Sequence, residues 1–142
     1  MANLWLYAIA ERGGLYFEFS GKKLPVSVKS YGQLLKNRKL KEDHWWYITQ
    51  HWRNVRLNDV VLIYTGDDDL GIIGYATVIG VDWRSDYKSW AIHLNFDFRR
   101  SSQLFHRRLV PARVVRKWVH YPRRNIINMN RFRSKLSRHL PK

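Results

Sequence analysis

Residues 58–83 read NDVVLIYTGDDDLGIIGYATVIGVDW, and this stretch decides the fold. The run VVLIYT at 60–65 is so apolar and so rich in β-branched side chains that it predicts a buried strand. The polar turn GDDD follows at 66–69, and the apolar run at 70–81 returns, which predicts an antiparallel hairpin. Glycines at 71, 74 and 80 are typical of the bulges by which a sheet curls into a small barrel.

The residues before this hairpin predict two strands and a loop. The aromatic run LWLYAI at 4–9 is typical of a buried strand, and 15–19 predicts a second, short strand after a pair of glycines. Residues 20–43 are rich in Lys, Gly, Pro and Ser, so we expect a loop with one helical turn at 31–35.

A helix is predicted over 44–55, just before the hairpin. Asp43 is placed to act as its N-cap. The apolar residues that follow the helical spacing are Trp45, Ile48, Trp52 and Val55.

The residues after the hairpin complete the predicted fold. Residues 90–98 alternate between apolar and polar side chains, which indicates a half-buried strand. We expect a further strand near 105–115 and a tract at 125–140 that is helical at its end. Together these elements predict one domain, 1–142, of the α+β class: a small mixed or antiparallel PUA-like β-barrel with flanking helices.

The acidic residues stop at Asp97, whereas the basic residues continue. All 11 Asp and Glu lie at or before this position, and residues 98–142 hold 14 of the 26 Lys and Arg. Residues 1–97 therefore have 12 basic and 11 acidic side chains, a net charge of +1, and the remaining +14 of the total of +15 belongs to 98–142. Because such a block releases counterions from a phosphate backbone, the leading partner is nucleic acid, either DNA or RNA.

Apolar and aromatic residues are interleaved with the basic residues of 98–142, so this tract is not a pure charged tail. The alternatives to nucleic acid are a solvated tail, a contact with an anionic membrane, and a ribosomal-type anchor on RNA. We expect the phosphate-binding side chains to be Arg107, Arg108, Arg123, Arg124, Arg131, Arg133 and Lys135.

Composition argues against several other classes of function. The chain has no Cys, which excludes disulfides and thiolate chemistry and fits a reducing intracellular compartment. The six His show no metal-ligand spacing such as H-x-x-x-H, so neither a metal nor a cofactor is expected. No stretch approaches the ~20 apolar residues that span a bilayer, and the N-terminus shows no signal-peptide pattern. We expect a monomer in the cytoplasm or on the nucleoid, without membrane contact.

Aromatic residues are the first candidates for base recognition. On a helix, Trp45 and Trp46 would point about 100° apart, so that only one of them faces the core. The other indole, and that of Trp83, would be free to stack on a base, a contact worth ~1–3 kcal/mol. The alternative is that tryptophans fill the core, which we expect for Trp5, Trp52 and Trp90.

Polar residues near these tryptophans complete the candidate pocket. Amide and hydroxyl groups suit the edge of a base, and the candidates are Thr49, Gln50, Thr65 and Gly66. The alternative for the first two is an ordinary solvated helix face. The loop at 82–87 adds Trp83, Asp86 and Tyr87. Its two carboxylates have no recognisable catalytic partner, so no catalytic residue is predicted.

The order of these motifs resembles the EVE domain of the PUA-like superfamily. The features it shares are the predicted aromatic helix, Asn58-Asp59, VVLIYTG at 60–66, an acidic turn and GIIGYATVIGVDW at 71–83. The resemblance implies a β-barrel related to the YTH domain, with an aromatic-walled pocket for a modified base formed by Trp46 and its neighbours, 65–66 and 83–87. The chain departs from the family pattern at Asn58, which replaces a Gly, and at Ser85, which replaces the loop Pro.

We therefore predict a non-catalytic nucleic-acid-binding module that recognises a modified base, such as a cytosine or adenine, and holds the backbone with 98–142. One alternative is a small hydrolase of the related ASCH type, which acts on a modified nucleoside with a Lys, a Thr and a Glu. Its later Glu has no counterpart here, because the last Glu is Glu42. The other alternative is a structural RNA-binding protein whose aromatic residues are only core.

Overall fold

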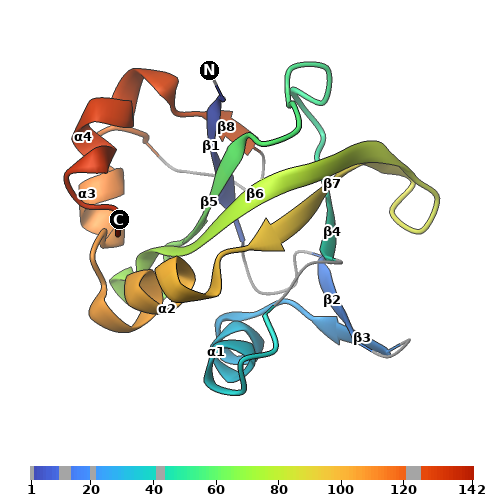
Figure 1. The fold of residues 1–142 in the computed structure, drawn as a ribbon, viewed down its shortest axis with the longest axis horizontal. Coiled ribbons are helices and arrows are strands. Elements are labelled where there is room, and N and C mark those ends of the chain that lie inside the picture. The colour runs from blue at the N-terminus through green and yellow to red at the C-terminus, as the bar shows by residue number, and fades with distance from the viewer. Residues whose placement is uncertain (1, 10–13, 20–21, 41–43, 121–125) are drawn as a thin grey trace.

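The structure is α+β and is built on one large mixed sheet (Figure 1). The computed structural model describes residues 2–9, 14–19, 22–40, 44–120 and 126–142. One sheet has the strand order β4-β7-β6-β5-β1-β8, and a two-stranded sheet pairs β2 with β3. The strands are β1 Leu4–Ala8, β2 Tyr16–Phe19, β3 Lys22–Pro25, β4 His44–Tyr47, β5 Val60–Thr65, β6 Gly71–Arg84, β7 Ser89–Phe96 and β8 Ile126–Asn128. The helices are α1 Val28–Lys36, α2 Phe98–Arg107, α3 Ala112–Val115 and α4 Arg133–Ser137, with 3-10 turns η1 Asp67–Asp69 and η2 Asn130–Phe132.

The predicted hairpin is confirmed as β5 and β6. The two strands pair antiparallel, from Val60 opposite Thr77 to Thr65 opposite Gly71. β5 also pairs in parallel with β1, and all five residues of β1 are buried. Strands covered on both faces read as continuous apolar runs, which is why the sequence identified both of them. The predicted short strand at 15–19 is confirmed as β2.

A buried carboxylate fixes the start of β5 against β1. Asp59 is 1% exposed, and its two oxygens accept three hydrogen bonds. The donors are the Trp5 indole Nε1–H and the backbone N–H groups of Asn3 and Arg56, each at 2.9 Å. A buried charge is tolerated only when it is satisfied in this way. Trp5, which we expected in the core, is 1% exposed.

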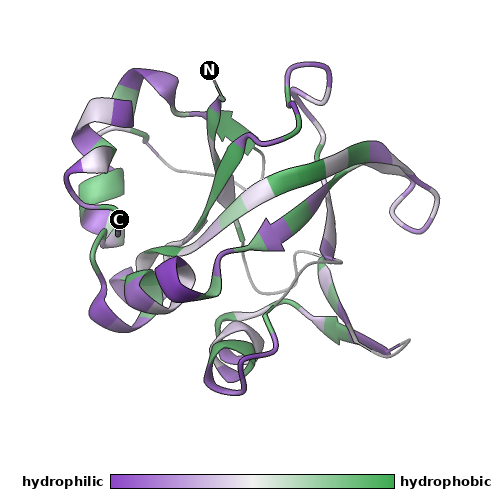
Figure 2. Ribbon diagram, in the orientation of Figure 1, coloured by the Kyte–Doolittle hydropathy of each residue, from purple (hydrophilic) through white to green (hydrophobic). Residues whose placement is uncertain are grey.

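Two hydrophobic clusters cover the two faces of the central strands. Along β5, Val61 and Ile63 belong to one cluster, and Leu62 and Tyr64 belong to the other. The first cluster includes side chains of β2 and α1, and the second includes side chains of α2, α3 and α4. Figure 2 shows the hydrophobic colour along β5 and β8 and hydrophilic residues on α2 and α4. The C-terminal helices are therefore a folded layer over one face of the sheet.

The helical turn predicted at 31–35 is confirmed as part of the nine-residue helix α1, whereas the loop predicted for the rest of 20–43 is wrong where β3 and the other residues of α1 lie. A reciprocal capping box starts the helix: the Ser27 side chain accepts from the Ser30 N–H, and the Ser30 side chain accepts from the Ser27 N–H. Tyr31 anchors α1 by donating its hydroxyl hydrogen to the Ile73 carbonyl at 2.5 Å. The phenol fits closely, since a Cβ at Gly74 would lie 2.6 Å from its oxygen.

The helix predicted over 44–55 is also wrong. His44–Tyr47 form β4, which pairs antiparallel with β7, and His44 and Trp46 are buried whereas Trp45 and Tyr47 are half-buried. This is a period of two, the pattern of a strand with one buried face. Aromatic residues favour a half-buried sheet surface. Pairing with β7 therefore makes this segment a strand, although the spacing of its apolar residues to Val55 also fits a helix. The predicted N-cap, Asp43, lies outside the described residues.

The strand predicted near 105–115 is wrong, because α2 and α3 lie there. β7 confirms the predicted strand at 90–98 up to Phe96, and then Asp97 caps α2 by accepting from the Arg100 N–H at 2.9 Å. The predicted helical end of 125–140 is confirmed by α4, in which Leu136 is buried. None of the described helices combines the length and apolar character needed to span a bilayer.

The large sheet is open over the described residues, where we predicted a closed barrel. Its edge strands are β4 and β8, and they do not pair with each other in that part of the chain. β5 pairs with β6 only as far as Thr77, whereas β7 pairs with β6 to its end at Arg84, and the tip of this hairpin projects from the sheet (Figure 1). A bulge between Val78 and Gly80 lies just beyond the last residue of β6 that pairs with β5.

The contrast between Trp46 and Trp83 tests this fold. Trp46 is 0% exposed and Trp83 is 53% exposed. We expect Trp46→Ala to lower the free energy of unfolding by about 3–5 kcal/mol, because it leaves a large cavity, and Trp83→Ala to change it by about 0.5 kcal/mol or less. Urea unfolding followed by circular dichroism measures both values. Equal losses for the two variants would contradict this assignment of core and surface.

Candidate nucleic-acid interface

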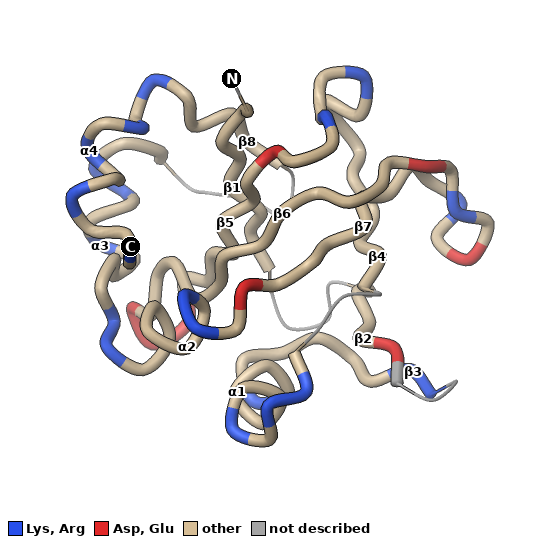
Figure 3. Tube along the Cα trace, in the orientation of Figure 1, with Lys and Arg blue, Asp and Glu red and all other residues tan. Residues whose placement is uncertain are grey.

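The outer side of the C-terminal helices carries a layer of exposed basic residues. Figure 3 shows Lys and Arg along α2, α3 and α4, at the end of the molecule away from the β6–β7 turn. Arg100 and Arg113 pair with Asp97 and Asp69, but seven other Lys and Arg side chains, all exposed, have no carboxylate within ion-pair distance among the described residues. We call them the basic layer: Arg107, Arg108, Arg116, Lys117, Arg131, Lys135 and Arg138.

Four of the residues predicted to bind phosphate are exposed: Arg107, Arg108, Arg131 and Lys135. Arg133 has a structural role, because it donates to the carbonyl of Ala2 at 2.5 Å and to Asn130 Oδ1 at 2.9 Å. Two further candidates, Arg123 and Arg124, lie outside the described residues. Three exposed residues of the basic layer were not predicted, although their place in the acid-free tract was a signal: Arg116, Lys117 and Arg138.

Trp46 was predicted to line a base pocket, but it lies in the core. This indole is completely buried, packs 5.5 Å from the Tyr7 ring and 5.7 Å from the Phe17 ring, and donates to the Tyr16 carbonyl at 3.3 Å. Trp46 is therefore a core residue in this structure and does not form an open pocket wall. Trp45 lies on the opposite face of β4 and is half-buried.

The remaining predicted pocket residues do not come together. Thr65 is buried at the end of β5, where its Oγ1 accepts from the Asp67 N–H at 3.2 Å. Gly66 lies beside the basic layer, since a Cβ there would be 3.0 Å from Arg116 Nη2. The segment from Trp83 to Tyr87 lies at the far end of β6, whose fourteen residues extend over about 40 Å.

Thr49 and Gln50 are exposed just after β4, because the helix predicted for them does not form. They follow the buried Ile48 at the edge of the sheet. Their side chains therefore remain accessible from solvent, in a turn instead of on a helix face.

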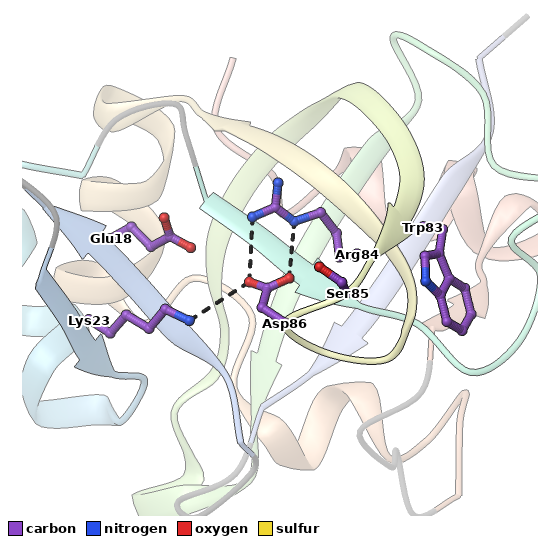
Figure 4. Close-up of a pocket in the computed structure, with 6 residues that line it drawn as sticks. All are labelled: Glu18, Lys23, Trp83, Arg84, Ser85 and Asp86. Atoms are coloured by element: carbon purple, nitrogen blue, oxygen red, sulfur yellow. Dashed lines mark hydrogen bonds and ion pairs between the residues drawn. The ribbon is translucent and has the colours of Figure 1, made fainter.

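Asp86, which was predicted as a pocket residue, lies in an ion-paired cluster at the end of the hairpin (Figure 4). Its carboxylate accepts from Arg84 at 3.2 and 3.4 Å and lies 3.8 Å from Lys23 Nζ. Burial works to raise the pKa of Asp86, but the hydrogen bond and charge of Arg84, with the charge of Lys23, hold this pKa below its usual value. A cavity of ≈ 390 Å³ lies beside the cluster and is lined by Glu18, Lys23, Trp83, Arg84, Ser85 and Asp86.

This cavity is lined by side chains of both charges and is not suited to bind phosphate, since the Asp86 carboxylate already pairs with Lys23 and Arg84. Figure 4 shows Trp83 apart from the ion pairs and pointing away from them. Among the described residues, no three His, Asp or Glu side chains are grouped so that they could hold a metal ion.

Trp45 belongs to a second aromatic group, on the outer face of the sheet. Its indole stacks on the His93 ring, with centroids 4.5 Å apart and an interplanar angle of 15°. The Arg84 guanidinium lies 5.0 Å from the Trp45 ring. A Cβ at Gly80 would be 3.2 Å from the indole, so this glycine makes room for it. His93 and Arg84 were not predicted, because only the strand register brings them to Trp45.

Three other tryptophans form a ladder on the opposite side of the hairpin. The rings of Trp52 and Trp90 stack at 4.3 Å and 2°, and Trp83 meets Trp90 edge-on at 6.4 Å. The Arg53 guanidinium lies 4.7 Å from the Trp52 ring. Trp52 and Trp90, which we expected to fill the core, are half-buried residues packed against its margin.

Comparison with known proteins identifies no relative of this chain. No protein-family model matches it, and neither a curated protein nor a solved structure matches it.

Tyr87 gives the hairpin cluster a measurable pH dependence. Its hydroxyl oxygen accepts from the Tyr16 N–H at 3.3 Å, and burial is the main cause that raises its pKa from 10.0 to about 12. Between these pH values the folded state holds a proton that the unfolded state has lost, so the free energy of unfolding falls as pH rises. We expect this fall to be shallower in Tyr87→Phe, measured by urea unfolding from pH 10 to pH 12. Identical slopes for the variant and the parent would show that Tyr87 does not titrate in this way.

Proposed function

We propose that this protein binds nucleic acid. The basic layer of α2–α4 would hold the phosphate backbone, and the aromatic residues near the β6–β7 hairpin would contact bases. The single observation that carries this proposal is the basic layer itself, which is exposed and has no neutralising carboxylates among the described residues. Phosphate contacts supply most of the affinity of such proteins, and base contacts supply their specificity.

The other charged residues of the C-terminal tract support this assignment. Arg100 pairs with Asp97 at 2.8 Å, and Arg113 pairs with Asp69. These two arginines are held by acidic partners, whereas the seven residues of the basic layer are exposed without one. An uncompensated surface of this kind attracts polyanions over a distance of about one Debye length, roughly 8–10 Å at physiological salt.

Folding of the tract argues against a merely solvated tail. Leu104, Val115 and Leu136 are each 0% exposed and fix α2, α3 and α4 against the sheet. Their burial holds the basic side chains on a defined frame, so that neighbouring phosphates can be contacted together. A disordered tail would lose this arrangement.

The proposal extends to recognition of a modified base by a PUA-like domain acting inside the cell. This part is supported by the resemblance of 58–83 to EVE domains and by the accessible tryptophans Trp45 and Trp83. Trp46 is no longer part of the proposed base site, because it lies in the core.

The salt dependence of binding tests the basic layer. A variant with Arg116→Ala, Lys117→Ala and Lys135→Ala removes three exposed cations. We expect the slope of log K against log salt for a single-stranded oligonucleotide to decrease in magnitude by about 2, because each lost phosphate contact accounts for about 0.7. Fluorescence anisotropy over a salt series gives this slope.

A matched control variant has the same net charge as this triple variant. Lys29→Ala, Lys36→Ala and Lys39→Ala remove three exposed cations on and beside α1, outside the basic layer. The control should retain the parental slope. If both triple variants changed the slope equally, the effect would be one of net charge, and the basic layer would not be the contact surface.

A pair of oligonucleotides that differ only in one methylated cytosine or adenine tests the modified-base part. Burial of one methyl group is worth about 0.8 kcal/mol, so we expect roughly fourfold tighter binding of the modified strand. Competition binding at fixed salt measures the ratio. If the protein binds the modified and the unmodified strand equally tightly, for cytosine and for adenine alike, this part of the proposal is wrong and binding to the backbone remains.

A further inference from the structure

One face of the sheet is shared by residues from three strands. The register places Trp45 of β4 opposite His93 of β7, and His93 opposite Gly80 of β6. Asn95, which is two residues beyond His93 on β7, lies opposite Thr77 of β6. Because alternate residues of a strand point to the same side, these side chains share a face. We call Trp45, Thr77, His93 and Asn95 the open sheet face.

This face begins where α2 stops covering β6. Ser101 Oγ of α2 accepts from the Tyr75 N–H at 3.0 Å, and Tyr75 packs against the cluster under the C-terminal helices. Farther along the sheet the side chains become accessible: Asn95 is exposed, and Ile79 in the bulge is 38% exposed. The other members of the open sheet face are half-buried.

Arginines lie beside the aromatic rings at both ends of this surface. At the hairpin end, the Arg84 guanidinium is 5.0 Å from the Trp45 ring, and at the α2 end, the Arg100 guanidinium is 4.8 Å from the Tyr75 ring. Tyr75 and Arg84 are both on β6, separated by about 30 Å along the strand. The surface is therefore long enough for several nucleotides, and the arginine at each end is ion-paired, Arg84 with Asp86 and Arg100 with Asp97.

The chemistry of the open sheet face suits unpaired bases. The rings of Trp45 and His93 stack on each other, and a base would stack on the solvent side of this half-buried pair. Asn95 and Thr77 provide the donors and acceptors that read a base edge. Asp82, opposite Ala91, brings a carboxylate to this side, and it accepts from the Trp83 N–H at 2.8 Å.

We propose that the open sheet face binds the bases of a single-stranded nucleic acid, with Trp45 as the main stacking residue. This inference rests on the proposed function, because the strand would continue from this surface past α2 to the basic layer. A duplex does not fit the site, since its bases are stacked on each other and their flat faces are not accessible to a sheet. The structure thus assigns the specificity for single strands to β4, β6 and β7.

Two substitutions at Trp45 separate stacking from packing. Trp45→Phe keeps an aromatic ring, and Trp45→Leu keeps an apolar side chain without one. We expect Trp45→Leu to bind a single-stranded oligonucleotide about 5- to 100-fold more weakly, and Trp45→Phe to keep most of the affinity. Binding of the duplex of the same sequence, and the salt slope for the single strand, should change little in both variants. Fluorescence anisotropy with DNA and RNA versions of the strand shows which sugar is preferred.

Leu24→Ala is the matched control, because Leu24 of β3 is an exposed apolar side chain that belongs neither to the open sheet face nor to the basic layer. It should leave single-strand affinity unchanged. If Trp45→Leu binds the single strand as tightly as the parent protein does, or if it weakens single strand and duplex equally, the inference is overturned and the proposed function stands. If the parent protein binds no nucleic acid at any salt concentration, both fail. Circular dichroism and the retained affinity of Trp45→Phe identify any loss that is due to misfolding.

Discussion

The length of β6 is the constraint on which the rest of the structure depends. Its first half pairs with β5 and is covered on both faces, and its second half pairs with β7, where Val78 still lies in the core and the strand end at Trp83 is exposed. The bulge before Gly80 marks this change, and the missing side chain at Gly80 leaves space for Trp45. A single strand thereby connects the rigid core to a sheet surface that faces solvent.

This arrangement separates charge from aromatic surface. The apolar side chains of the C-terminal helices pack against the sheet, and their basic side chains are exposed to solvent. The aromatic residues of the open sheet face lie on the same face of the sheet as these helices, and α2 lies between the two surfaces. A bound strand can therefore be held by its phosphates at one end and by its bases at the other, which is the division of contacts typical of nucleic-acid-binding proteins.

Local patterns predicted the elements that are decided locally. The β5–β6 hairpin was predictable because two apolar runs flank a polar turn, and β1 because it is buried on both faces. The error at 44–55 had a tertiary cause, since pairing with β7 makes a strand of a segment whose spacing also fits a helix. That error reversed the roles assigned to Trp46 and its neighbour. His93 and Arg84 could not be predicted as partners of Trp45, because only the register brings them together.

Amide chemical-shift mapping with a short single-stranded oligonucleotide is the most direct test of the central claim, that the C-terminal helices and the open sheet face form one binding surface. The account predicts saturable shifts along β4, β6 and β7 at Trp45, His93 and Asn95, continuing into α2–α4. It predicts little change in α1 and β3. Shifts confined to α1, β2 and β3, with β7 and the C-terminal helices unaffected, would contradict it.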